Sequence, residues 1–147
     1  MLINYPFDII SGNLPSNAAV LVIDDEFLSV FICEQFIKRI VKDPEISSCS
    51  NGKHAIDLLL EIKNQDIGLL PDYIFLDIAM PVMNAWEFLE KYNDLNIDPS
   101  GKCKIYILTS SLYQSDIRKS ASFTMITDYI IKPLDAEKMR NVFIGAN

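Results

Sequence analysis

Five short runs typical of β-strands alternate along the chain with segments that have the period of a helix. The predicted strands cover 19–24, 45–50, 73–77, 103–110 and 127–132. Between them, apolar residues recur at i, i+3, i+4 and i+7. The predicted helices cover 27–42, 51–65, about 85–92, a polar and weakly periodic segment at 112–122, and a last segment from about 135. Near-continuous apolar strands joined by amphipathic helices indicate a parallel sheet covered on both faces. The sequence therefore predicts a doubly wound α/β domain.

The residues that end the predicted strands carry the chemical information. In an open parallel sheet, ligands bind at the carboxyl ends of the strands. Four of the five strands end in groups that can bind a metal or a phosphoryl group: Asp24-Asp25-Glu26, Asp77, Thr109 and Lys132. We therefore expect one edge of the sheet to gather three aspartates, a hydroxyl and a lysine.

Carboxylates gathered in this way need a compensating charge. A buried carboxylate is costly unless it is paired or binds a metal. At an effective dielectric near 20, two carboxylates about 4 Å apart repel by roughly 4 kcal/mol, so without compensation one of them takes up a proton. A hard divalent cation removes the repulsion, and carboxylate and water oxygens suit Mg²⁺ or Mn²⁺. A lysine ammonium and a threonine hydroxyl then suit the oxygens of a phosphoryl group.

Each of these residues also has a simpler explanation. Strand ends are wet, so polar residues gather there, and most lysines are merely solvated. Taken singly, Asp24-Asp25 and Lys132 fit that explanation. Their combination with Asp77 and Thr109 at the ends of four strands is hard to assign to chance.

Composition excludes several other classes of protein. The chain has 147 residues, enough for one domain, and a formal net charge of −7 with its basic residues scattered, which argues against a nucleic-acid-binding face. Its three cysteines form no CxxC pair and it has one histidine, which argues against a zinc site. The first residues carry no Lys or Arg and only a short apolar patch, so they predict neither a secretory signal nor a membrane span. We expect a cytoplasmic protein.

The strand-end motifs closely resemble those of the receiver domain of two-component response regulators. "VLVIDDE" resembles the acidic pair after the first strand, "DIAMPVMNAWEF" the phosphoacceptor stretch, "ILTSS" the switch segment, and "YIIKP" the Lys-Pro motif. The resemblance covers about residues 18–146. It implies a flavodoxin-like (βα)5 sandwich whose parallel strands have the order 2-1-3-4-5. It also divides the chain into a leader, 1–18, and a receiver domain, 19–147.

The resemblance implies a role for each acidic residue. Asp77 is the nucleophile that accepts a phosphoryl group from a phosphohistidine and forms an acyl phosphate. Asp25 binds Mg²⁺, or Mn²⁺, directly. Asp24 binds it directly or through water, and Asp77 and the backbone carbonyl of Ala79 complete the protein ligands.

The remaining motifs imply a phosphoryl-binding lysine and a switch. Lys132 pairs with the phosphoryl oxygens, and its peptide bond to Pro133 is cis, as the family pattern implies. Thr109 moves to hydrogen-bond the phosphoryl group, and Tyr129 rotates into the space that this movement leaves. The change alters the surface of the fourth helix, fifth strand and fifth helix, where a downstream protein is expected to bind.

A protein with these parts is a phosphoacceptor switch that assists its own phosphorylation and dephosphorylation, rather than an enzyme with a separate substrate. Its expected phosphodonor is a sensor histidine kinase or a histidine phosphotransfer protein. Because the last predicted helix ends near residue 147, we expect a stand-alone, chemotaxis-regulator-like receiver. It would signal through a conformational switch or pass phosphate onward in a relay.

The sequence departs from the family at one position and leaves two alternatives open. Ala85 stands where the family usually has Gly, and a positive φ there would cost Ala roughly 1 kcal/mol, so we expect a different turn into the third helix. Trp86 is expected to be a packing residue. One alternative is a Mg²⁺-dependent phosphatase of the haloacid-dehalogenase type, which needs Asp-x-Asp after the first strand and a cap insertion. The other is a degenerate receiver that only binds proteins, although the acidic and lysine positions are all present.

Overall fold

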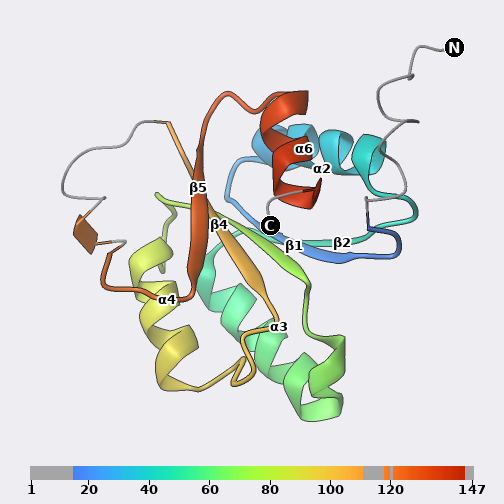
Figure 1. The fold of residues 1–147 in the computed structure, drawn as a ribbon. Coiled ribbons are helices and arrows are strands. Elements are labelled where there is room, and N and C mark those ends of the chain that lie inside the picture. Colours follow the sequence, from blue (N-terminus) through green and yellow to red (C-terminus); the bar gives the residue numbers. More distant parts are fainter. Residues whose placement is uncertain (1–14, 111–117, 120, 145–147) are drawn as a thin grey trace, which may run out of the picture.

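The computed structural model describes residues 15–110, 118–119 and 121–144. These residues form a five-stranded parallel sheet with helices on both faces (Figure 1). The strand order is β2-β1-β3-β4-β5, which confirms the predicted doubly wound, flavodoxin-like class. The strands are β1 (Ala19–Ile23), β2 (Glu45–Cys49), β3 (Tyr73–Asp77), β4 (Lys104–Thr109) and β5 (Ile126–Ile131).

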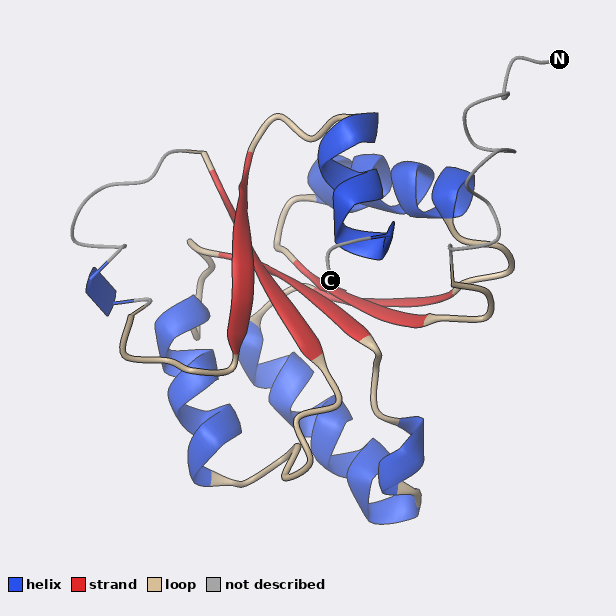
Figure 2. Cartoon of the chain, in the orientation of Figure 1, coloured by secondary structure: helices blue, strands red, loops and turns tan. Residues whose placement is uncertain are grey.

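The helices divide between the two faces of the sheet (Figure 2). α2 (Phe27–Ile40) and α6 (Ala136–Ile144) pack together on one face, and α3 (Gly52–Gln65) and α4 (Ala85–Asp94) pack together on the other. A short 3-10 helix, η2 (Ile67–Leu69), follows α3 and was not predicted. The helix predicted over 112–122 falls mostly on residues 111–117 and 120, which lie outside the described residues. Within the described part of the chain, no helix is long and apolar enough to cross a membrane.

Two layers of core residues hold the helices to the sheet. Successive side chains of a strand point to opposite faces. Leu21 and Ile23 of β1 therefore join the layer under α3 and α4, whereas Val20 and Val22 join the layer under α2 and α6. The central strand β3 is buried at all five positions. This burial explains its continuous apolar run and places Asp77, its last residue, at the rim of the core.

The loop between β3 and α4 shows how Ala85 begins its helix without a positive φ. Ala85 is the first residue of α4 and is fully buried, while Asn84 before it is extended and forms a capping box with Glu87. The left-handed residue of the loop is Val82, with φ of 69°. Because Asn84 caps the helix from an extended conformation, Ala85 needs no positive φ. Trp86 stacks on Phe123 with the ring centroids 6.0 Å apart, as expected of a packing residue.

Candidate functional site

Three carboxylates meet at the carboxyl ends of β1 and β3. The parallel register sets Ile23 opposite Leu76, so the residues that follow, Asp24 and Asp77, lie side by side. One carboxylate oxygen from each of Asp24, Asp25 and Asp77 lies within 4.8 Å of the others. Asp24 and Asp77 are buried, with 2% and 9% exposure, whereas Asp25 is exposed. The cluster is therefore set into the edge of the sheet and opens to solvent on the side of Asp25.

Among the described residues, Lys132 has the only ammonium in contact with this cluster. Its Nζ lies 3.1 Å from Oδ1 of Asp77 and 3.4 Å from Oδ2 of Asp24. Its backbone N–H donates to the carbonyl of Thr109 at 2.7 Å, which continues the pairing of β4 with β5. The peptide bond from Lys132 to Pro133 is cis.

Asp24 is held by two backbone contacts that the sequence did not indicate. Its N–H donates to the carbonyl of Cys49 at 3.0 Å, and its Oδ1 accepts the N–H of Glu26 at 3.0 Å. Because Oδ2 faces Lys132, both carboxylate oxygens have a partner. These contacts depend on the pairing of β1 with β2 and on the turn into α2, and no local pattern in the sequence points to them.

Burial and mutual repulsion shift the protonation of the site. Burial raises the pKa of Asp77, and the carboxylate of Asp24 raises it further, despite the opposing effect of Lys132. Burial also raises the pKa of Asp24, against the N–H of Glu26 and Lys132. For Lys132, burial lowers the pKa, but the carboxylates of Asp77 and Asp24 outweigh it and the pKa is raised. One ammonium thus faces three carboxylates, and the site retains negative charge.

These residues fit a hard divalent cation. All the donor atoms are carboxylate oxygens, and two of the three carboxylates are buried beside a single ammonium. Oxygen ligands with open positions left for water suit Mg²⁺ and Mn²⁺. Ala79, whose carbonyl is the further expected ligand, lies in the loop two residues after Asp77 and is exposed.

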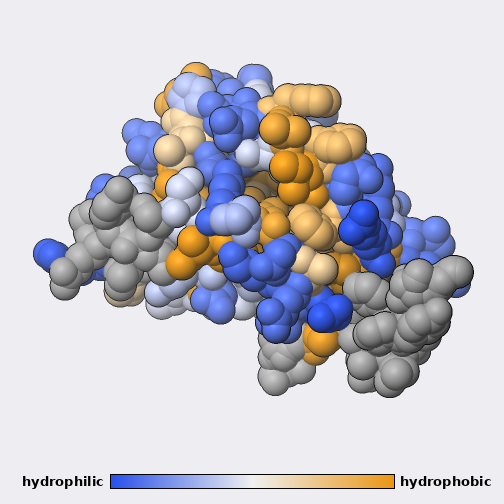
Figure 3. Space-filling model, turned by 90° about the horizontal axis from the view of Figure 1, so that it is seen from above, coloured by the Kyte–Doolittle hydropathy of each residue, from blue (hydrophilic) through white to orange (hydrophobic). Residues whose placement is uncertain are grey.

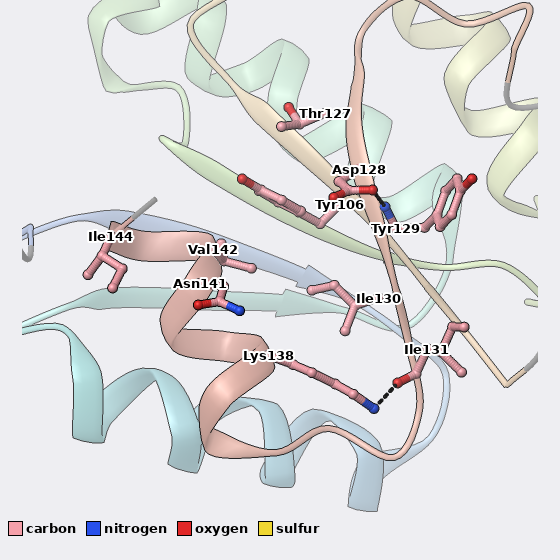
Figure 4. Close-up of a pocket in the computed structure, with 10 residues that line it drawn as sticks. All are labelled: Tyr106, Thr127, Asp128, Tyr129, Ile130, Ile131, Lys138, Asn141, Val142 and Ile144. Atoms are coloured by element: carbon pink, nitrogen blue, oxygen red, sulfur yellow. Dashed lines mark hydrogen bonds between the residues drawn. The ribbon is translucent and has the colours of Figure 1, made fainter. Parts of the chain in front are cut away.

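The two predicted switch residues lie on neighbouring strands. Thr109 is buried at the end of β4, one residue beyond Leu108, which pairs with Asp77. Tyr129 is half-buried in β5 and packs against the core layer under α3 and α4. Figure 4 shows its ring on the opposite side of β5 from Lys138 and Asn141.

A cavity of about 890 Å³ lies between β5 and α6, on the face predicted for a downstream partner (Figure 4). Its lining comes mainly from β5 and α6, among them Asp128, Lys138 and Asn141, and Tyr106 of β4 adds to it. The cavity does not include the aspartate cluster. It is a separate surface feature that reaches the end of β5, one residue before Lys132.

The fold and site together define a doubly wound domain with an acidic, lysine-containing pocket at the carboxyl edge of its sheet. Residues 20–143 match the response regulator receiver domain. The chain therefore belongs to the response regulator receiver domain family. Receiver domains are signalling switches of two-component systems, bind Mg²⁺ in an acidic pocket, and interact with histidine kinases or histidine phosphotransfer proteins.

Relatives of different lengths share this domain. The chemotaxis protein CheY of Listeria monocytogenes is 30% identical over 123 residues, covering 82% of this chain and 90% of that protein. The two-component response regulator ARR14 of Arabidopsis thaliana is 28% identical over 138 residues, covering 91% of this chain and 32% of that protein. The chain thus spans only about a third of the length of this plant relative. A crystal structure of a response regulator from Cytophaga hutchinsonii is 31% identical with a TM-score of 0.74, covering 88% of this chain and 93% of that one.

Proposed function

We propose that this chain accepts a phosphoryl group on Asp77, in a Mg²⁺-dependent reaction, from a phosphohistidine of a sensor kinase or phosphotransfer protein. The observation that carries the proposal is the contact of Asp77 with Lys132 at 3.1 Å beside Asp24 and Asp25. This contact supports the proposal because Asp77 would then have a cation for the phosphoryl group and two further carboxylates for Mg²⁺ beside it. We further propose that the receiver domain covers 19–147, after a leader of residues 1–18, and that it acts in the cytoplasm.

Each side chain of the pocket has a role in the proposed phosphoryl transfer. A carboxylate oxygen of Asp77 attacks the phosphorus, the bond from the donor's imidazole nitrogen to phosphorus breaks, and an acyl phosphate forms. The ammonium of Lys132 pairs with oxygens of the transferred group. Asp24, Asp25, Asp77 and the carbonyl of Ala79 would hold Mg²⁺, which supplies neutralising charge for the phosphoryl oxygens. The exposure of Asp25 leaves a path from solvent to this pocket.

The acyl phosphate then switches the surface. It adds roughly −1.5 to −2 charges and three acceptor oxygens at the sheet edge. The hydroxyl of Thr109, at the buried end of β4, moves to bond them, and Tyr129 on the adjacent β5 turns into the space that is left. The result is a population shift between two packings of one fold. Amide exchange with and without beryllofluoride tests this switch: protection should change in β4 and β5, and a change confined to α2 and α3 would contradict it.

Two surfaces are available for partners. Four large apolar residues of α2 are exposed beside the acidic pocket: Phe27 (83%), Leu28 (65%), Phe31 (47%) and Ile32 (39%). From the side on which α2 and α6 lie, hydrophobic surface appears among hydrophilic residues (Figure 3). Contiguous exposed apolar residues mark protein interaction sites. Phe27 and Phe31 line one hollow together with Asp24 and Asp25, and this place beside the acidic pocket suits a phosphodonor. For the downstream protein we propose the face of β5 and α6, with the predicted helix at 112–122, which lies mostly outside the described residues.

The alternatives fit the pocket less well. A haloacid-dehalogenase-type phosphatase needs two aspartates separated by one residue, whereas Asp24 and Asp25 are adjacent. A degenerate receiver would lack part of the site, whereas Asp77 and Lys132 are in contact here. We propose that the chain has no substrate besides its own acyl phosphate, whose formation and hydrolysis it assists.

Incubation with acetyl phosphate, with and without Mg²⁺, separates the three functions. A receiver should gain an acyl phosphate, which hydroxylamine removes, only with Mg²⁺, and Asp77→Asn should gain none. A phosphatase would instead release phosphate continuously from a range of phosphate esters. A degenerate receiver would neither gain a phosphoryl group nor release phosphate, and that result would refute the proposal.

A further inference from the structure

The first turn of α6 contains a lysine whose side chain reaches back to the end of β5. Nζ of Lys138 donates to the carbonyl of Ile131 at 2.8 Å and to the carbonyl of Pro133 at 2.9 Å. These two carbonyls belong to the residues on either side of Lys132, the lysine in contact with Asp77. Figure 4 shows the Lys138 side chain extended from α6 along the wall of the cavity to Ile131.

Lys138 stands where helix electrostatics disfavour a cation. It is the third residue of α6, and the N-terminal turn of a helix carries partial positive charge. The helix is capped in the ordinary way, because the carboxylate of Asp135 accepts the backbone N–H of Lys138 at 2.8 Å. The ammonium is therefore not needed for capping. Its two carbonyl contacts offset its unfavourable place on the helix and tie α6 to the segment from Ile131 to Pro133.

Together with β4, Lys138 holds the backbone around Lys132 by hydrogen bonds. On one side, the N–H of Lys132 is bound to the carbonyl of Thr109 in β4. From α6, the ammonium of Lys138 donates to the carbonyls of Ile131 and Pro133, the residues before and after Lys132. A lysine side chain is long and flexible, so the position of its ammonium depends on how well its backbone is held.

We propose that Lys138 is a positioning residue for phosphoryl transfer, which holds the backbone on both sides of Lys132 and thereby keeps the Lys132 ammonium at Asp77. The inference rests on the proposed function of Asp77 and Lys132. The side chain of Lys138 contacts the carbonyls of Ile131 and Pro133, and not the proposed nucleophile or metal ligands. Loss of Lys138 should therefore slow phosphoryl transfer without weakening Mg²⁺ binding.

The test compares Lys138→Met with wild type in acetyl phosphate labelling at saturating donor and Mg²⁺. We expect a rate about three- to tenfold lower, the range that the loss of one or two hydrogen bonds gives, with unchanged Mg²⁺ affinity. Lys138→Arg should restore most of the rate, because a guanidinium can also donate to both carbonyls. Lys91→Met, which removes the same charge from the last turn of α4, is the matched control and should label like wild type.

A double variant decides whether Lys138 acts through Lys132. In a Lys132→Ala background, Lys138→Met should have no further effect on the rate. A further loss of similar size in that background would overturn the proposal, as would a Lys138→Met rate equal to that of wild type.

Amide exchange of Lys132 keeps this test separate from that of the proposed function. In Lys138→Met without any phosphodonor, the Lys132 amide should exchange about three- to tenfold faster than in wild type. If wild type takes up no phosphoryl group, the proposed function fails. If the Lys132 amide exchanges at the same rate in Lys138→Met as in wild type, Lys138 does not hold this segment. If wild type is labelled but Lys138→Met is indistinguishable from it in both measurements, only the role of Lys138 is lost.

Discussion

The ammonium of Lys132 lies 3.1 Å from Oδ1 of Asp77, although 55 residues separate them in the chain. β4 lies between their strands in the sheet, so the side chain of Lys132 passes the end of β4 to reach Asp77. Thr109 ends β4 at that point. The ends of β3, β4 and β5 therefore lie together at one edge of the sheet.

Metal binding should depend on Asp25 and not on its neighbour Glu26. Asp25 belongs to the carboxylate cluster, whereas Glu26 accepts the hydroxyl of Ser29 at 3.0 Å at the start of α2. Asp25→Ala should weaken binding roughly tenfold or more, because one charge close to the cation is lost. Titration with Mn²⁺, followed by the electron paramagnetic resonance of the free ion, measures this. Glu26→Ala is the control and should change the affinity less than about twofold; an equal loss in both variants would refute the assignment.

Without divalent metal, the protein should become more stable as the pH is lowered from about 7.5 to about 5. Burial raises the folded-state pKa values of Asp77 and Asp24 above the ordinary carboxyl value, so the native state binds more protons than the unfolded chain in that window. Stability is then lost as the pH rises through the raised pKa values. Urea unfolding in the presence of a chelator measures the effect. Asp77→Asn should be more stable than wild type at about pH 7.5 and should show a weaker pH dependence.

The exposed carboxylate of Asp57, which pairs with Lys53 on α3, provides the control for this pH effect. Asp57→Asn should leave the pH dependence of wild type unchanged. A wild-type stability that rises with pH under chelation would contradict the picture of repelling carboxylates.

Replacing Gly52 should disturb the loop that carries the Ala79 carbonyl. A Cβ at Gly52 would lie 2.9 Å from both the carbonyl oxygen and Cγ of Met83, and the Gly52 N–H donates to that carbonyl. Gly52→Ala should therefore cost about 1–3 kcal/mol of unfolding free energy in urea and also weaken Mn²⁺ binding. At Gly68 a Cβ would meet only a side-chain oxygen of Asp66, at 3.2 Å. Gly68→Ala should be much milder, and equal losses would show that contact with Met83 is unimportant.

Val82 should be a site where a substitution stabilises the fold. It is β-branched, has φ of 69°, and is 74% exposed, so its side chain loses conformational freedom without contributing to the core. Val82→Asn should raise the unfolding free energy by about 1 kcal/mol, because Asn adopts left-handed conformations at lower cost. Val82→Ala removes the branch but keeps an ordinary L-residue, so it should gain less. A Val82→Asn protein no more stable than Val82→Ala would contradict this explanation.

The sequence predicted the strands, the acidic cluster and Lys132 because each depends on local patterns. Apolar runs mark buried strands, and in a parallel sheet the strand ends meet at one edge whatever the loops do. The left-handed Val82 could not be predicted in this way, because no local pattern in the sequence marks it. The contact of Gly52 with Met83 was also missed, because it joins segments that are distant in the sequence. The contacts of Lys138 were missed for a similar reason: only the folded chain shows where so long a side chain ends. A cation in the first turn of a helix was the available signal.

The site of the acyl phosphate is the most direct test of the proposed function. After incubation with acetyl phosphate and Mg²⁺, borohydride reduces an aspartyl phosphate to homoserine, which peptide mass spectrometry locates in the sequence. The pocket built from Asp77, Lys132 and the paired aspartates predicts reduction at Asp77 alone, and none in protein incubated without Mg²⁺. Homoserine at Asp24 or Asp25, or at no position in a protein shown to be folded, would contradict the assignment of Asp77 as the nucleophile.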